Sequence, residues 1–259
     1  MDTTWFSAAG LEPVQLAILT LAALLTSGLS AIVGMGGGIT LLAVMLLFLD
    51  PLVAIPLHAV IQMVSNGTRT LAQRRHVDWR IFALYALPLL PLGWLSLWLA
   101  QEIPPAAARA MIGAFVLVAT WRPGWLLLGT RPEEINPKVR FLTLGAVVGV
   151  VNVTFGATGP LIAPFFLNIG LSRFAIIGTK AVCQVAGHIV KIVVFGLAGF
   201  AFPQWAGVLV LLCGCVVAGT ALGTRILSRV SETVFLKLYR GVLTAIAAFL
   251  VLRYGLLAA

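Results

Sequence analysis

Charged residues are rare in this 259-residue chain, where they make up 10% of positions against about 25% in soluble domains. No hydrophilic stretch is long enough to form a soluble domain. Hydrophobic residues account for 61% of the chain, and apolar runs of roughly 18 or more residues, each able to cross a bilayer, recur along its length. The composition therefore predicts an all-α, polytopic integral membrane helical bundle whose surroundings are the lipid bilayer.

Acidic residues are the scarcer charged type, with 8 Asp and Glu against 17 Lys and Arg. Most basic residues stand in short loops beside apolar runs, so membrane orientation explains the net charge of +9 better than nucleic-acid binding does. A cation pathway would normally hold carboxylates within the spans, and every acidic residue lies in a terminus, a loop or at a segment end. These residues are Asp2, Glu12, Asp50, Asp78, Glu102, Glu133, Glu134 and Glu232.

The sequence also lacks the usual signatures of catalysis and of cofactor or metal binding. Its 3 cysteines, Cys183, Cys213 and Cys215, form no C-x-x-C pair and lie in apolar runs, where we interpret them as packing residues. Neither H-E-x-x-H nor G-x-S-x-G occurs, so we expect no enzyme, no metal and no cofactor. The N-terminus has no basic region of a cleaved signal peptide, and we expect it to be retained.

The apolar segments form two series of five. They occupy residues 13–34, 39–49, 52–69, 81–100 and 106–121, then 141–151, 161–169, 174–199, 206–223 and 242–257. We assign 1–121 to a first membrane repeat, 122–140 to a cytoplasmic connecting loop and 141–259 to a second repeat. Because five is odd, the second repeat is inverted relative to the first. The sequence thus predicts eight to ten membrane segments, in which the first pair of each repeat either spans or is re-entrant.

Each repeat contains a break in its apolar pattern. The first break holds Gly36, Gly37 and Gly38, and the second, 152–160, holds Asn152, Thr154, Thr158 and Gly159. Unwound backbone inside a membrane is tolerated where it lines a cavity, and the helix ends it frees present N–H groups that favour an anion. The alternative interpretation is close helix packing through small residues. We favour a ligand site because packing does not require the polar residues of the second break.

Two polar stripes follow these breaks at matching positions, 122 residues apart. Spacings of four, four and three place each stripe on one helix face, where polar groups in hydrocarbon need a partner or water. The stripes are His58, Gln62, Asn66 and Arg69 in the first half, and Lys180, Gln184, His188 and Lys191 in the second. We interpret them as two walls of one site for a small inorganic or organic anion.

Several stripe residues have a second interpretation. His58 taken alone is typical of a core histidine with satisfied hydrogen bonds. Arg69, Lys180 and Lys191 are long enough to snorkel toward the membrane interface, Lys180 less easily than the others. Gln62 and Gln184 lie near mid-helix and are the strongest candidates for contact with the anion.

The stretch from Gly34 to Ile39, its counterpart from Phe155 to Pro160 and the polar helix after each break resemble the sulfite exporter TauE/SafE family of bacterial transporters. The resemblance covers essentially the whole chain. It implies a multi-pass protein of the bacterial cytoplasmic (inner) membrane that transports sulfite, organosulfonates or related organic acids, with export as the expected direction. The second break departs from the glycine-rich pattern, with Asn152 and Thr154 where the first has Ser30 and Ile32.

Three functions remain open at this point. A secondary anion transporter is the leading hypothesis, because it explains both polar stripes. A passive anion channel is the alternative within transport, and it would not accumulate anion against a gradient. A non-transporting structural subunit of a membrane complex is the third, and it would have no need of the stripes.

The distribution of basic loops generates a prediction of orientation. Loops 73–80, 122–140, Arg173 and 225–240 should be cytoplasmic and both termini external, although Arg253 lies near the external C-terminus. In a variant without native cysteines, Gln101→Cys should react with an impermeant thiol reagent in intact cells, and Glu133→Cys should be protected. The opposite labelling pattern would contradict the five-plus-five plan.

Overall fold

The computed structural model describes residues 10–33, 36–166, 169–226 and 232–256, which are helical with short connections and contain no strand. The first half contains α2 (Pro13–Val33), α3 (Gly37–Met45), α4 (Pro51–Ala72), α5 (Trp79–Ala86), α6 (Leu89–Gln101) and α7 (Pro105–Trp121). The second contains α8 (Pro137–Phe155), α9 (Gly159–Ile162), α10 (Arg173–Leu197), α11 (Ala206–Ile226) and α12 (Glu232–Val251). The connections include short 3₁₀ turns at 74–76, 123–127, 132–134, 163–166 and 202–205. A π-helical turn at 252–256 follows α12.

Local sequence explains where the main helices begin. Pro51, Pro105 and Pro137 occupy the first turn of α4, α7 and α8, where the missing N–H costs no hydrogen bond. Asp78 caps α5 by accepting from the backbone N–H groups of Arg80 and Ile81. These features set the start of α4, which carries the first polar stripe, and the starts of α5, α7 and α8.

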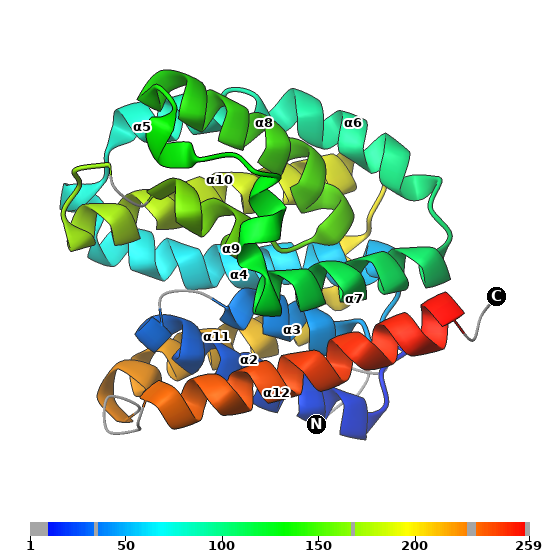
Figure 1. Cartoon of the computed structure of the whole chain (residues 1–259). Coiled ribbons are helices and arrows are strands. Elements are labelled where there is room, and N and C mark those ends of the chain that lie inside the picture. The colour runs from blue at the N-terminus through cyan, green and yellow to red at the C-terminus, as the bar shows by residue number, and fades with distance from the viewer. Residues whose placement is uncertain (1–9, 34–35, 167–168, 227–231, 257–259) are drawn as a thin grey trace.

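The helices pack in pairs that join the two halves (Figure 1). The stripe-bearing α4 and α10 lie against each other, α2 packs on α11, α8 on α6, and α7 on α12. If α5 and α6 are counted as one segment, the helices of the two halves match in order as α2 with α8, α3 with α9, α4 with α10, α5–α6 with α11 and α7 with α12, and this set of pairs maps onto itself. An inverted repeat would produce such packing, and the inversion itself stays a prediction.

Each break contains a glycine in a conformation that other residues rarely adopt. After α2, Gly36 has a φ of 99° and α3 begins at Gly37, while Gly34 and Met35 lie outside the described residues. After α8, Gly156 adopts φ 75° and α9 begins at Gly159. These positive φ values suit glycine, which has no Cβ to clash.

The predicted start of the second break at residue 152 is wrong. Asn152 and Thr154 lie in the last turns of α8, which continues to Phe155. Both side chains have partners within the folded chain: Asn152 Nδ2 donates to the Gly187 carbonyl at 3.0 Å, and Thr154 Oγ1 bonds back to the Val150 carbonyl at 3.3 Å. The break proper comprises residues 156–158.

Other predicted boundaries also shift. The segment predicted at 81–100 is two helices, α5 and α6, separated at Leu87-Pro88 because proline cannot continue the hydrogen-bond ladder. Helix α8 begins at Pro137, inside the predicted 122–140 connection, and α12 begins at Glu232, ten residues before the apolar segment predicted at 242–257.

Among the described residues, 5 helical stretches are long and apolar enough to cross a membrane, or up to 6 if the bent pair that begins at Pro105 counts as one span. Helix α3 has 9 residues and α9 has 4, so each reaches only part of the way across a core about 30 Å thick. The polar stripe lowers the hydropathy of α4, which is 22 residues long. The prediction of eight to ten membrane segments therefore extends beyond what length and hydropathy alone establish.

Glycines allow α2 and α11 to approach closely. A Cβ at Gly219 would overlap the Leu24 carbonyl oxygen, and one at Gly223 would lie 2.6 Å from the Gly28 Cα. Gly214, on the same helix, has open space around its Cβ position. The Gly219–Gly223 spacing is the small-residue motif that brings membrane helices into contact.

Gly219→Ala should therefore destabilise the protein while Gly214→Ala should not. Overpacking at such a contact costs roughly 1–3 kcal/mol, which corresponds to a loss of several degrees in Tm. Thermal unfolding of the purified variants in detergent measures the difference. Equal Tm values for the two variants would show that α2 and α11 do not cross this closely in solution.

Candidate functional site

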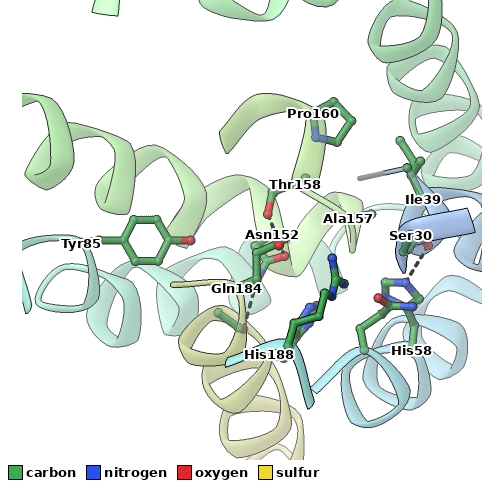
Figure 2. Close-up of a pocket in the computed structure, with 16 residues that line it drawn as sticks. Ser30, Ile39, His58, Tyr85, Asn152, Ala157, Thr158, Pro160, Gln184 and His188 are labelled. Atoms are coloured by element: carbon green, nitrogen blue, oxygen red, sulfur yellow. Dashed lines mark hydrogen bonds between the residues drawn. The ribbon is translucent and has the colours of Figure 1, made fainter. Parts of the chain in front are cut away.

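A polar cavity lies where the two breaks meet α4 and α10 (Figure 2). Its empty space is about 520 Å³, a volume that includes the open mouth. Residues of both halves line it, from α2, α3, α4, α5, α8, α9 and α10 and from the segments that precede α3 and α9. The lining residues are Ser30, Gly36, Gly38, Ile39, His58, Gln62, Arg69, Tyr85, Asn152, Ala157, Thr158, Gly159, Pro160, Gln184, Gly187 and His188.

The two glutamines occupy comparable places in the cavity. Each lies over a glycine in the first turn of the short helix that follows its own break. A Cβ at Gly38 would be 3.1 Å from Gln62 Oε1, and one at Gly159 would be 3.5 Å from Gln184 Nε2. The glycines therefore leave room for both amide groups to face the cavity.

The first break is tied to α4 by a histidine. His58 is buried, and its Nε2 lies 2.8 Å from the carbonyl oxygen of Gly38. Thr40 Oγ1 donates to the Gly36 carbonyl at 3.0 Å. The His58 bond holds the first turn of α3 to α4, and the Thr40 hydroxyl adds a second donor to a carbonyl that already accepts from the Thr40 backbone N–H at 3.2 Å.

The second break is tied to α10 by different chemistry. Asn152 Nδ2 donates to the Gly187 carbonyl at 3.0 Å, and its Oδ1 accepts from Thr158 Oγ1 at 3.4 Å. Lys191, fully buried, donates from Nζ to the Gly156 carbonyl at 2.5 Å. A charged donor thus satisfies the carbonyl at the C-cap of α8, where the macrodipole favours a cation.

A hydrogen bond joins the two stripes at equivalent positions. Asn66 Nδ2 lies 3.3 Å from His188 Nε2, and these two residues are the pair related by the 122-residue shift. Arg69 Nη2 donates to Asn66 Oδ1 at 2.9 Å. The contact puts the equivalent faces of α4 and α10 against each other, as the sequence pattern predicts for two walls of one site.

Ten of the fifteen residues that the sequence singled out line this cavity, and five do not. Asn66 stands behind it and holds Arg69 and His188, while Lys191 is turned to Gly156. Lys180 is half-buried on α10, one turn before Gln184. The other two, Gly37 and Thr154, have packing roles.

Gly37 packs against α2, since a Cβ there would overlap the Thr26 carbonyl oxygen. Its neighbours Gly36 and Gly38 are the glycines of the first break that line the cavity. Thr154 Oγ1 lies 2.9 Å from Ser96 Oγ at the contact of α8 with α6, away from the cavity. Spacing placed both residues in the right segment, but it does not tell which neighbouring helix each faces.

Six lining residues were not identified from the sequence: Ser30, Ile39, Tyr85, Ala157, Pro160 and Gly187. Tyr85 matters most, because its buried hydroxyl has no hydrogen-bond partner among the described residues. Figure 2 shows this hydroxyl pointing toward Asn152. An unsatisfied buried hydroxyl is costly, so it is a candidate donor to a bound ligand.

The buried ionisable side chains among the described residues are, apart from Tyr85 and Cys183, basic. They are His58, Arg140, His188 and Lys191. Asp50 is 60% exposed and pairs with Arg109 at 2.6 Å, and Asp78 caps α5. The cavity therefore combines amide, hydroxyl and imidazole groups with nearby cations and no carboxylate from the described part of the chain.

In the described residues no three His, Cys, Asp or Glu side chains are grouped closely enough to hold a metal ion.

Comparison with known proteins supports the pattern seen in the sequence. A protein-family model described as sulfite exporter TauE/SafE matches residues 19–250. No match was found among curated proteins or among solved structures. The matched region includes both breaks, both stripes and every residue that lines the cavity. The chain belongs to the sulfite exporter TauE/SafE family and is a membrane transporter of sulfur-containing anions.

Proposed function

We propose that this protein exports sulfite and small organosulfonates across the bacterial inner membrane, and that the anion binds between Gln62 and Gln184. The observation that carries the proposal is the make-up of the cavity. Its lining contains hydrogen-bond donors from both halves, buried basic side chains lie beside it, and the described carboxylates lie outside it. An anion would supply the negative charge that such a site needs.

The donors suit the three oxygens of a sulfite or sulfonate group. Each glutamine amide offers N–H groups from one half of the chain, and the Tyr85 hydroxyl has no other partner in the described part of the chain. Thr158 lies beside them on the second break. Several directed donors can hold a compact oxyanion that presents acceptors on all sides.

Two cations at the site, Lys191 and Arg69, have partners within the protein. Lys191 is bonded to the Gly156 carbonyl and Arg69 to Asn66. Their charges favour an anion in the cavity without a direct ion pair, and neutral donors make the contacts. A neutral donor forms a charge-assisted bond to the anion without the added attraction of a direct ion pair, so this arrangement binds moderately and permits release.

Transport requires that the cavity open to each side in turn. The short helices α3 and α9 form part of its wall. His58 of α4 bonds to the Gly38 carbonyl in the first turn of α3, and Asn152 near the end of α8 donates to the Gly187 carbonyl of α10. Broken helices at the interface of two repeats are typical of secondary transporters. A passive channel, the second candidate, would equilibrate the anion and would not accumulate it against its gradient.

Gln62→Leu and Gln184→Leu should each weaken anion binding. Loss of one hydrogen bond to a charged group costs roughly 1.5–3 kcal/mol, a factor of about ten to a hundred in affinity. Leucine has a similar volume, so expression and Tm should change little. Sulfite and methanesulfonate flux into proteoliposomes, at matched protein levels, measures the effect.

Gln204→Leu is the matched control, because Gln204 is exposed in the 202–205 turn and should leave flux unchanged. Wild-type flux in both the Gln62 and Gln184 variants would show that the anion does not bind between these residues.

A further inference from the structure

The orientation of the Asn66 amide is fixed by two partners with unambiguous roles. Its Oδ1 accepts from Arg69 Nη2 at 2.9 Å, and a guanidinium can only donate. Its Nδ2 donates to the Gln62 carbonyl at 2.9 Å, and a carbonyl can only accept. The amide therefore cannot be flipped without the loss of both bonds.

This orientation determines the tautomer of His188. Asn66 Nδ2 also lies 3.3 Å from His188 Nε2, so the amide N–H points at a ring nitrogen that must accept. His188 is then neutral and carries its hydrogen on Nδ1. A proton on Nε2 would face the N–H of Asn66 and break this network.

A backbone carbonyl determines the tautomer of His58, which carries its hydrogen on Nε2 and not on Nδ1 as His188 does. His58 Nε2 lies 2.8 Å from the Gly38 carbonyl, which can only accept, so Nε2 carries a hydrogen. In the neutral ring, Nδ1 then carries a lone pair. This nitrogen can take up a proton while the bond from Nε2 to the Gly38 carbonyl stays intact. Neither His58 Nδ1 nor His188 Nδ1 has a hydrogen-bond partner among the described residues.

The two rings lie edge to face in the cavity wall, with centroids 6.1 Å apart. One ring thus offers a buried N–H donor, and the other offers a buried lone pair. A sulfonate has three acceptor oxygens and no proton of its own near neutral pH, so a bare lone pair would repel it. Protonation of His58 would convert this lone pair into a second N–H donor.

Most of the charged groups around His58 are basic. Of the elements packed against it, α2, α3 and α9 contribute no titratable side chain. α10 contributes His188, Lys191 and Lys180, and α4 contributes Arg69, while Arg109 of α7 is paired with Asp50. Tyr85 of α5 and the thiols Cys183, Cys213 and Cys215 of α10 and α11 are further titratable groups on these helices.

We propose that binding of a sulfonate takes up one proton, which is held on His58 Nδ1, and that His188 remains a neutral N–H donor. The inference rests on the proposed function and specifies its coupling, because the anion and the proton move as a neutral pair. The proton comes from water on the side from which the anion enters, and no bond of the anion is changed. The buried basic cluster therefore gains one negative and one positive charge together.

Calorimetry with methanesulfonate tests the proposal. The full-length protein in nanodiscs is titrated at one pH in two buffers that differ in ionisation enthalpy, and the difference in heat gives the number of protons bound. We expect about one proton per anion, and affinity that falls by about tenfold for each rise of one pH unit over the range where only the complex holds the proton. The sign follows because uptake of a proton on binding is opposed by high pH.

Two variants separate the histidines. His58→Gln retains an N–H that can donate to Gly38 but has no Nδ1, so proton uptake should fall to zero and affinity should become independent of pH. His188→Gln retains an acceptor for Asn66 and loses the Nδ1–H donor, so binding should weaken while the uptake of one proton persists. His76→Gln, in an exposed turn, should behave as wild type.

Nitrogen-15 spectra of the histidine rings give a readout on the empty protein. We expect His58 with hydrogen on Nε2 and His188 with hydrogen on Nδ1, and a doubly protonated His58 once methanesulfonate is bound. Binding without proton uptake, or loss of uptake in the His188 variant alone, would overturn the inference and leave the proposed function standing. Absence of any methanesulfonate binding would overturn both.

Discussion

The rest of the structure depends on a requirement of the membrane interior, where every buried polar or charged group needs a partner. The chain meets this requirement by setting α4 against α10, where the two stripes meet at the bond between Asn66 and His188. Asn66 is the central example, because it bonds to the Gln62 carbonyl, to Arg69 and to His188 at once. What the protein does not supply, among the described residues, is a buried carboxylate, and a bound anion would fill that role.

The same requirement explains why the broken helices are held as they are. An interrupted helix leaves carbonyls without intrahelical partners, and in hydrocarbon such groups are expensive. Lys191 bonds to the carbonyl of Gly156, which follows the end of α8, and His58 holds the first turn of α3 to α4 through the carbonyl of Gly38. These side chains are therefore structural and electrostatic at once: they stabilise the breaks and place positive or protonatable groups around the cavity.

Much of the site could be predicted from the sequence because helical spacing and a constant shift carry that information. Gln62, Gln184, His58 and His188 recur at intervals that put them on facing sides of two helices, and they line one cavity. Spacing fixes the face of a helix but not the neighbour that covers it. Gly37 for this reason packs on α2 and Thr154 on Ser96, away from the cavity.

Tyr85 shows a different limit of sequence analysis. A tyrosine in an apolar run has the same signature whether its hydroxyl faces a site or lies at the membrane interface, so nothing singled it out. The end of α8 was misplaced because Asn152 and Thr154 are weak helix formers, and tertiary contacts with Gly187 and Ser96 override that local preference. Both errors arise where long-range contacts determine the outcome.

The location of a bound anion tests the central claim most directly. Selenite has the shape and charge of sulfite, and its selenium gives an anomalous X-ray signal. The account predicts a selenium peak in the cavity between the side-chain amides of Gln62 and Gln184, and its loss in a Gln62→Leu, Gln184→Leu double variant. A peak confined to the basic 73–80 loop, with an empty cavity, would contradict it.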